Sequence, residues 1–569
     1  MDYSFTGSTF PVRAKRTGLQ EISGANGMDF RLLMALAVLV NFSGMFVTVM
    51  GPDGALYASI AKTMAQHNDY IRLFAEGRDW LDKPHFPFWM AAFSFQLFGY
   101  ATWAYKLPAV LFLMMGAIYT YRLAKSLYNG EVAWWATAIL LTAGHTVISN
   151  TDVRAEPYLT GAIIASVFHF YRARSGKGFG HLAAGALFAA VAVMTKGPFA
   201  LIPIAGAIGG ELIIKKDWRA LFHFRWMIAA ALTFLFILPE LYCLYVQFDA
   251  HPEKTVFGRT GVSGIRFFFW DSQFGRFLNT GPIKGKGDPA FYLHTVLWAF
   301  LPWSVLLYAA VVNKIRKGWT RVSQTEWLTV AGALPCFIVF SLSKFQLPHY
   351  LNILFPFFAI LTAQYVLNGR TEGGRKFIRI TQTVFTILLP VAAIAIHLLF
   401  RPGQTPALLV LVIGGIVVMA RLRPLLKKSE SVQYLLVRTM VAAVLVNFYL
   451  NLVFYPALLK YQSGSEAAFV ANRQFPAAKV VQLQTGEYNH ALDFYLRSPL
   501  QTIHQLGDTS HLTGGPLLLF ADVNAMAGSG LSPVQTFGHI HVSKLSIKQV
   551  NARTRQKDVQ HFGLYLLRR

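Results

Sequence analysis

The segment RLLMALAVLVNFSGMFVTVMGPDGALYASIAKTM (residues 31–64) decides the fold class. Its first part, from about Leu32 to Met50, is an apolar run of the length that a helix needs to cross a bilayer, about 20 residues. The run ends in a Pro-Asp-Gly turn that carries a lone carboxylate, Asp53, and a helix-like segment follows at once. A membrane anchor needs no carboxylate at this point, so Asp53 is a candidate functional residue.

The composition extends this interpretation to the whole chain. Of 569 residues, 54% are hydrophobic and only 14% are charged, which is outside the range of soluble domains and is typical of a polytopic membrane protein. The net charge of +25 does not indicate a nucleic-acid-binding surface, because the Lys and Arg residues fall in short clusters between apolar runs. We expect membrane lipids, and no nucleic acid, among the partners.

Apolar runs of spanning length recur along the chain as far as residue 457. They predict a polytopic α-helical membrane domain over residues 1–457 with about 13 transmembrane helices. We place the spans at 32–50, 104–122, 131–149, 153–171, 181–195, 198–214, 226–247, 290–312, 327–343, 349–367, 380–400, 405–421 and 435–457. The polar first 29 residues lead into the first run without a small-residue cleavage pattern, so we expect a retained first span and no removed signal peptide.

Basic clusters predict the orientation. They occupy every second connection between the spans, beginning at the N-terminus, and the positive-inside rule makes these connections cytoplasmic. The clusters are Arg13/Lys15/Arg16, Arg122/Lys125, Arg172/Arg174/Lys177, Lys215/Lys216/Arg219, Lys314/Arg316/Lys317/Arg321, Arg370/Arg375/Lys376/Arg379 and Arg421/Arg423/Lys427/Lys428. An odd number of spans then puts the C-terminal tail outside, together with the long connections 51–103 and 248–289.

Two external regions have predicted structure of their own. Within 51–103, ALYASIAKTM and FPFWMAAFSFQLFG are too short or too interrupted to span, and we expect amphipathic helices at the membrane interface. After residue 457 the pattern changes to short strand-like runs between Gly, Pro and Asn. These runs are AKVVQL, ALDFYL, PLLLFAD, HIHVSKLSI and FGLYLLRR. They predict a small mixed α/β domain over residues 458–569.

The unusual polar residues gather at the external ends of the predicted spans. They are Asp53, Asp82, Lys83, His85, Asp152, Arg154, Glu156, Lys196, Asp271, Arg276, Lys344 and His349. Ionisable groups at this boundary are solvated at modest cost, whereas each would cost about 2.5–3.5 kcal/mol at the bilayer centre. These side chains are therefore able to converge on one external cavity.

Structural roles compete with functional ones at each of these positions. Asp53 can shape its turn, and the lysines can anchor the chain at the membrane interface. Asp152, Arg154 and Glu156 can pair among themselves. Arg276 lies in the aromatic stretch RFFFWDSQFGRF and can stack on a ring. The histidines are individually weak candidates, although their pKa suits acid–base chemistry.

As a set, the motifs resemble those of bacterial members of the GT-C superfamily, in particular the aminoarabinose transferase and protein O-mannosyltransferase-like families. The motifs, in order, are Asp53 with Tyr57 and Ala58, LDKPHFPFW, YKLPAVLF, TKGPFALIP, the aromatic segment with Arg276, and SKFQLPHYLNILFPFFAIL. The resemblance covers residues 30–370 or thereabouts. These families are polytopic enzymes that move a sugar from a polyprenyl-phosphate carrier to an acceptor on the external side.

The resemblance implies roles for individual residues. Asp53 matches the acidic residue that opens the first external loop of the family, and it is the implied catalytic residue. Lys83, Arg276 and Lys344 match basic residues of the family motifs. Together with Lys196, they are the cations expected to bind the donor phosphate. The residues expected to bind the acceptor or to line the cavity are Asp152, Glu156, Tyr57, His85 and His349.

Two positions depart from the family pattern. Gly54 stands where many members have a second acid, so a site with paired carboxylates is not expected here. His85 replaces the second proline of the Asp-Lys-Pro-Pro motif, and the donor contacts of this loop are expected to differ for that reason.

The implied reaction suits these residue types. A sugar on a lipid phosphate has a good leaving group, so the site needs cations where phosphate charge accumulates and a base for the attacking hydroxyl. Direct attack inverts the anomeric carbon. The resemblance thus implies a hexosyl- or pentosyltransferase of the bacterial inner membrane, facing the periplasm, with lipid A, a glycan or a protein as acceptor. If the acceptor is a phosphate, Asp53 mainly orients it.

Two alternatives stay open: a ligase for a preassembled lipid-linked glycan, and a non-enzymatic transporter of lipids or solutes. A transporter is expected to carry mid-span ionisable residues and an internal duplication, and we see neither. We find no Rossmann-type glycine motif, DxD motif or CxxC pair, and Cys243 and Cys336 lie in apolar runs as packing residues. No obligatory cofactor or metal is expected, although a divalent cation stays open because carboxylates face the predicted cavity.

Overall fold

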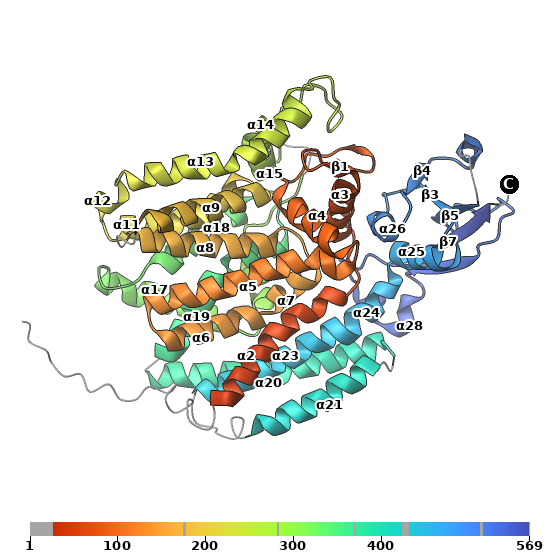
Figure 1. Cartoon of the computed structure of the whole chain (residues 1–569). Coiled ribbons are helices and arrows are strands. Elements are labelled where there is room, and N and C mark those ends of the chain that lie inside the picture. Colours follow the sequence, from red (N-terminus) through yellow and green to blue (C-terminus); the bar gives the residue numbers. More distant parts are fainter. Residues whose placement is uncertain are drawn as a thin grey trace, which may run out of the picture.

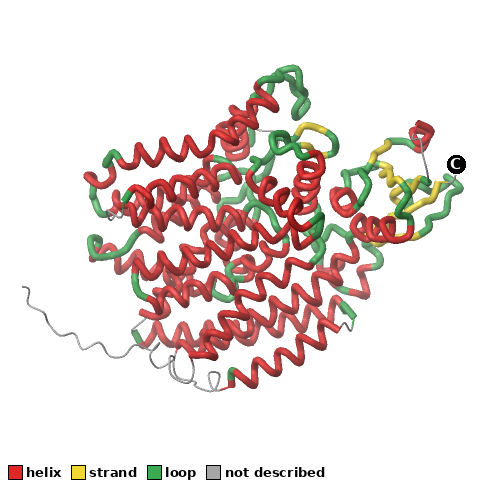
Figure 2. The backbone as a smooth tube through the Cα atoms, in the orientation of Figure 1, coloured by secondary structure: helices red, strands yellow, loops and turns green. Residues whose placement is uncertain are grey.

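The computed structural model describes residues 27–174, 178–280, 284–368, 371–403, 406–423, 432–511 and 516–567. Most of the described chain is a helical bundle, and strands occur in a short hairpin and in the C-terminal tail (Figure 1, Figure 2). Several basic residues of the predicted cytoplasmic clusters lie outside the described residues, namely Arg13, Lys15, Arg16, Lys177, Arg370, Lys427 and Lys428.

The helices of the bundle lie where the apolar runs predict them. The bundle consists of α2 (Gly27–Ser43), α5 (Thr102–Leu127), α6 (Gly130–Thr142), α7 (Gly144–Thr151), α8 (Glu156–Arg174), α9 (Phe179–Lys196), α10 (Leu201–Ala205), η3 (Gly206–Gly210), α11 (Glu211–Ile214), α13 (Arg225–Leu244), η4 (Tyr245–Asp249), α16 (Phe291–Ala299), α17 (Ser304–Gly318), α18 (Leu328–Leu342), η7 (Pro348–Leu354), α19 (Phe355–Asn368), α20 (Glu372–Phe400), α21 (Pro406–Arg421), α23 (Val432–Tyr449), η8 (Leu450–Phe454) and α24 (Tyr455–Leu458).

Among the described residues, six helices are long and apolar enough to cross a membrane, or seven if the bent pair α6 and α7 is one span. This is the pattern of a multi-pass membrane protein. Several predicted spans are interrupted helices: the run 290–312, for example, forms α16 and α17, separated by a segment with Pro302, which has no backbone N–H to donate. The number of 13 spans stays a prediction.

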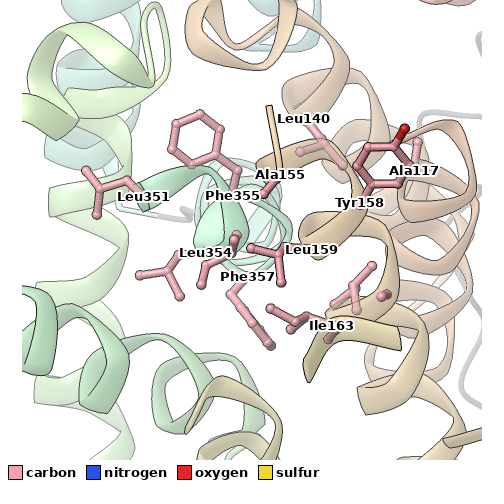
Figure 3. Packing of buried hydrophobic residues seen from close by; sticks show 14 of the residues in the cluster. Ala117, Leu140, Ala155, Tyr158, Leu159, Ile163, Leu351, Leu354, Phe355 and Phe357 are labelled. Carbon is pink, nitrogen blue, oxygen red and sulfur yellow. The ribbon is translucent and has the colours of Figure 1, made fainter. Parts of the chain in front are cut away.

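The core of the bundle lies where α5, α6, α8 and α19 meet. Figure 3 shows the buried side chains of Leu140, Tyr158 and Phe357 in this region, which come from α6, α8 and α19. Glycine allows the closest approach: a Cβ on Gly161 of α8 would lie 2.1 Å from the carbonyl oxygen of Phe112 on α5. The two helix backbones are therefore in contact, as small residues permit in membrane helices.

One end of the bundle carries most of the smaller elements that surround the predicted site. Figure 1 shows α3, α4 and the strands at this end, and α12 (Trp218–Leu221) at the opposite end. The elements at this end include α3 (Asp53–His67), β1 (Phe74–Ala75), β2 (Arg78–Asp79), α4 (Phe86–Phe98), α14 (Gly264–Arg266), η5 (Phe267–Asp271) and α15 (Ser272–Leu278). Both helices predicted within 51–103 are present as α3 and α4. Most of α3 is buried, because it packs against α4 and the tail.

The tail contains a five-stranded mixed sheet with the strand order β4-β3-β5-β7-β6. The strands are β3 (Lys479–Leu483), β4 (Gln501–Ile503), β5 (Leu517–Asp522), β6 (Gln535–His539) and β7 (Gln560–Leu567). β3 pairs in parallel with β4 and β5, so that Val481 lies opposite both Gln501 and Leu519. β7 pairs in the antiparallel sense with β5 and β6. Buried residues of α25 (Ser463–Gln474) and of the segment around Leu492 cover one face of this sheet.

The strand prediction was wrong for two of the five runs. ALDFYL belongs to the helix α26 (His490–Tyr495), whose first turn is capped by the Asn489 side chain accepting from the backbone N–H of Leu492. A six-residue run is too short for its periodicity to separate a helix from a strand. Only the first residue of HIHVSKLSI, His539, belongs to β6. The chain after it leads to α27 (Ile547–Val550) and α28 (Ala552–Arg555). The boundary at residue 458 and the external position of the tail stay predictions.

Candidate active site

Asp53 is the first residue of α3 and lines a small polar cavity of about 230 Å³. The N-terminus of this helix carries a partial positive charge that favours a carboxylate. Arg154, in the turn between α7 and α8, donates a 2.5 Å hydrogen bond to Oδ2 of Asp53. The Asp53 side chain is 42% exposed, and no described residue donates to its Oδ1. One carboxylate oxygen is thus free to accept a proton from a ligand.

A second carboxylate reaches the same guanidinium from another segment. Oδ2 of Asp152 lies 2.9 Å from a terminal nitrogen of Arg154. Gly54 allows this approach, because a Cβ at that position would lie 3.0 Å from Oδ1 of Asp152. A larger residue at position 54 would crowd Asp152. The paired carboxylates that the sequence did not lead us to expect are therefore supplied by Asp53 and Asp152, which hold Arg154 between them.

A cationic cluster joins the region 51–103 to the connection 248–289. Asp82 and Lys83 follow β2, and Arg276 lies on α15. The Asp82 carboxylate accepts hydrogen bonds from both cations. Burial raises the pKa of Asp82, but the charges of Lys83 and Arg276 outweigh burial and hold this pKa below its ordinary value. One ionised carboxylate between two cations leaves the cluster with a net positive charge.

A third group lies where α9 ends and α8 begins. Lys196 is the last residue of α9, and its ammonium forms a buried ion pair with Glu156, the first residue of α8. The Lys196 ammonium also lies 3.7 Å from the centre of the Tyr350 ring. Nε2 of His349 is 3.8 Å from Oε1 of Glu156. Residues from three separate motifs thus meet beside the Asp82 cluster.

Two cavities meet at these groups. The larger cavity, of about 470 Å³, is lined mainly by aromatic and aliphatic side chains, including Phe199, Phe267, Phe268, Phe269 and Phe274. The smaller cavity is the polar one that contains Asp53. Both are lined by Asp82, Lys83, Lys196, Arg276, Phe345 and Tyr350. Four cations and three carboxylates line the smaller cavity, so an apolar chain with an anionic head fits this arrangement.

Known proteins are similar to this chain in sequence and in architecture. Residues 82–242 match the family described as dolichyl-phosphate-mannose-protein mannosyltransferase. The undecaprenyl phosphate-alpha-4-amino-4-deoxy-L-arabinose arabinosyl transferase of Edwardsiella ictaluri is 30% identical over 333 residues, which cover 57% of this chain and 56% of that protein. A second arabinosyl transferase of this description, from Sodalis glossinidius, is 25% identical over 412 residues, 69% of this chain and 70% of that protein.

The fold agrees with these matches. The crystal structure of ArnT from Cupriavidus metallidurans bound to undecaprenyl phosphate is similar with a TM-score of 0.70 at 19% identity, over 95% of this chain and 98% of that chain. In sequence and fold, the chain is similar to glycosyltransferases of the GT-C superfamily. The matched region spans little more than half the length of the Edwardsiella relative, 56%.

Most of the predicted site residues line the small cavity. They are Asp53, Tyr57, Lys83, Glu156, Lys196, Arg276 and His349. Asp152 lies behind them against Arg154, and its Oδ1 is buried with no hydrogen-bond donor among the described residues. Asp53 and His349 are 296 positions apart in the sequence, and both line this one cavity.

Besides Asp152, two predicted site residues line neither cavity. His85 is fully buried, with Nδ1 at 3.0 Å from Oε1 of Glu240 and Nε2 at 2.9 Å from the carbonyl oxygen of Ile71. Its observed contacts are structural, and the predicted cavity position was wrong. Lys344 is exposed and lines neither cavity. The turn between α18 and η7 instead directs the neighbouring Phe345 into both cavities.

Three polar residues of the small cavity were assigned no individual role, although Asp82 and Arg154 were among the polar residues expected at the external ends of the spans. Asp82, Arg154 and Tyr350 all line the small cavity. Each lies within two positions of a predicted site residue, and this proximity was the available signal. Within the described ranges, no group of three or more His, Cys, Asp or Glu side chains is arranged to hold a metal ion. The metal requirement of the reaction stays a prediction.

Proposed function

We propose that this protein transfers one sugar from a polyprenyl-phosphate donor to an acceptor hydroxyl, with inversion, at the periplasmic face of the bacterial inner membrane. The observation that carries the proposal is that Lys83 and Arg276 line both cavities. An isoprenoid chain then lies in the aromatic cavity and the phosphate at the junction. The sugar extends into the small cavity beside Asp53. The donor named in the relatives' descriptions, an undecaprenyl phosphate sugar, supports this assignment.

The cations stabilise the leaving group. Arg276 offers a planar fork for two phosphate oxygens and Lys83 a point charge, and both exchange part of their contact with Asp82 for the phosphate. Negative charge grows on the bridging phosphate oxygen as the bond to the anomeric carbon breaks. Fixed cations in a site shielded from water lower the energy of that charge.

Asp53 acts as the base. The acceptor hydroxyl attacks the anomeric carbon from the side opposite the phosphate, and its proton passes to the free Oδ1 of Asp53. The new carbon–oxygen bond forms while the bond to the phosphate oxygen breaks, and the polyprenyl phosphate leaves with the electron pair. Arg154 holds Oδ2 of Asp53 and so orients the carboxylate. General-base catalysis of this kind typically contributes about 10²–10⁴-fold.

A binding and product experiment tests this function. Purified protein in vesicles is titrated with undecaprenyl phosphate and with undecaprenol, which lacks the phosphate. Recognition by Lys83 and Arg276 predicts that undecaprenol binds far more weakly, and equal affinity would contradict the phosphate site. Mass spectrometry of envelope lipids, glycans and proteins with and without the protein then identifies the acceptor among lipid A, a glycan and a protein. No change in any of the three fractions would contradict the transferase assignment.

A further inference from the structure

The tail contains a third cavity, of about 430 Å³, that the proposed transfer step does not use. It lies between the carboxyl ends of β3 and β5 in the five-stranded sheet and the Gly51-Pro52 turn that precedes α3. Figure 1 shows α26 between this sheet and α3. We call this cavity the tail groove.

The topology of the sheet favours ligand binding at the carboxyl ends of these strands. β3 and β5 are parallel neighbours in the sheet. After β3 the chain continues to β4 on one side of this pair, and after β5 it continues to β6 and β7 on the other side. In open α/β sheets, ligands bind outside the carboxyl ends of parallel strands where the strand order reverses in this way. The tail groove is lined by residues 485–490, which follow β3, and by Phe520 and Asp522 at the end of β5.

The polar lining of the tail groove differs from that of the small cavity. It offers hydroxyl and amide groups, such as those of Thr485, Ser543 and Gln560, and the carboxyl groups of Glu487 and Asp522. None of the described residues that line it is Lys or Arg, whereas four cations line the small cavity. A phosphate would meet acids here. A ring that carries hydroxyl or amino groups would find both donors and acceptors.

The groove also has an aromatic wall. The rings of Phe520 and Phe562 stack at a centroid distance of 5.2 Å with 9° between their planes. His539 packs edge-on against Phe562 at 5.4 Å. An aromatic wall combined with a few convergent polar groups is the usual lining of a site for a small, partly apolar ring. The C–H face of a sugar ring has this character.

The groove adjoins the proposed base. Gly51 and Pro52 line it and directly precede Asp53. Gln462 of the tail fixes this turn, because its Oε1 accepts from the N–H of Gly51 at 2.8 Å and its Nε2 donates to the carbonyl of Val49 at 2.9 Å. A ligand in the groove is thus held against the turn that carries the catalytic carboxylate.

We propose that the tail groove binds the saccharide part of the acceptor through rings that carry hydroxyl or amino groups and no phosphate. This inference rests on the proposed function, because the groove would present an acceptor hydroxyl to Asp53. It narrows the acceptor to a molecule with a sugar portion at the point of attachment. The acids and amides select the hydroxyl and amino groups, and the Phe562 face selects the ring.

A groove-filling substitution tests the acceptor role. Gln560→Trp on β7 fills the groove with an indole, and Gln535→Trp on the neighbouring β6 is the matched control, since Gln535 is also exposed and does not line the groove. We expect Gln560→Trp to raise the KM for the acceptor about tenfold or more, with unchanged affinity for undecaprenyl phosphate. An acceptor KM close to that of the wild type would overturn the proposal.

Direct binding separates this inference from the proposed function. A glucosamine disaccharide and the same disaccharide carrying two phosphates are titrated into the full-length protein in detergent. We expect the unphosphorylated disaccharide to bind better, with binding lost in Gln560→Trp and kept in Gln535→Trp. Asp522→Asn, which preserves side-chain size, is the second variant and should weaken binding of the amino sugar. Preference for the phosphorylated disaccharide, or no binding, overturns the groove assignment. Disaccharide binding without undecaprenyl phosphate binding supports the groove and contradicts only the transferase.

Discussion

Arg154 holds Asp53 through a hydrogen bond of 2.5 Å from its terminal nitrogen to Oδ2. The same guanidinium lies 2.9 Å from Oδ2 of Asp152, so its position does not depend on Asp53 alone. Asp53 is consequently fixed by one oxygen while the other stays open to the small cavity. This geometry suits a base that must be ionised and oriented before the acceptor arrives.

Asp53→Asn tests the base directly. Asparagine keeps the size of the side chain and an oxygen for Arg154, but it cannot accept the acceptor proton. We expect the variant to fold in detergent and to bind undecaprenyl phosphate, while transfer falls by about 10²–10⁴-fold. Transfer rates and donor affinity measured on the same preparation check this. Turnover within a few-fold of the wild type would leave Asp53 with a role in the turn, or in orienting a phosphate acceptor.

Arg276→Lys tests the phosphate contact. Lysine keeps the charge but loses the planar fork that can bind two oxygens at once, so donor affinity should fall. The matched control is Arg266→Lys, because Arg266 lies on the same connection, 248–289, is 74% exposed and lines neither cavity. Titration with undecaprenyl phosphate measures both variants. Normal donor affinity in Arg276→Ala would instead assign Arg276 to packing against Phe345, whose ring centre lies 5.8 Å away.

Lys62 joins α3 to the tail. Its buried ammonium donates to the backbone carbonyls of Asp493, Phe494 and Leu496 at 2.8, 3.1 and 2.6 Å. Lys62→Met would leave these carbonyls without their donor, and we expect a destabilisation of about 1–3 kcal/mol or more. The thermal midpoint in detergent should fall, whereas Lys460→Met at an exposed position should not change it. Equal midpoints for both variants would show that the tail docks without this contact.

Stability should decrease in mild acid. Burial lowers the pKa of both His490 and His539 to about 4 from the ordinary 6.5, although the charge of Asp53 partly opposes this at His490. At a pH between the folded and the unfolded pKa, the unfolded chain binds more protons than the folded chain. The free energy of unfolding therefore falls as the pH is lowered through this range. Thermal midpoints at about pH 7.5 and about pH 5 measure the effect. His490→Gln should remove part of the difference, and an unchanged difference would exclude His490 as its source.

The predicted topology has its own test. Basic clusters in alternate connections predict cytoplasmic positions for the loops near residues 220 and 320 and an external tail. Reporter fusions after residues 220, 320 and 470 should therefore give two cytoplasmic signals and one external signal. A cytoplasmic signal after residue 470 would reverse the tail, and the active site that packs against it would be reversed with it.

The positions of the membrane helices could be predicted because apolar length is a local property. Each apolar run near the spanning length became one helix or a series of consecutive helical segments, and α5, α9 and α13 are examples of the first kind. The tail was less predictable. Its runs are short, so ALDFYL matched a strand and a helix equally well, and its burial against α3 and α25 selected the helix.

The candidate site was predictable in composition and not in geometry. Charged residues at helix ends stand out in an apolar chain, so Asp53, Lys83, Glu156, Lys196 and Arg276 were found from the sequence and all line the small cavity. Lys344 and His85 carry the same kind of signal and lie elsewhere. A motif indicates that a polar residue is present, but not the direction in which its side chain points.

Local chemistry along the chain was enough to establish a multi-pass helical protein with its ionisable residues at helix ends, because spanning length and charge are counted over neighbouring residues. Packing between distant segments settled the rest. It brought Arg154 to Asp53 and Arg276 to Asp82, and it placed the tail groove beside the Gly51-Pro52 turn. These contacts join residues about 100 to 500 positions apart, and their geometry depends on how helices and strands pack, which no short stretch of sequence contains.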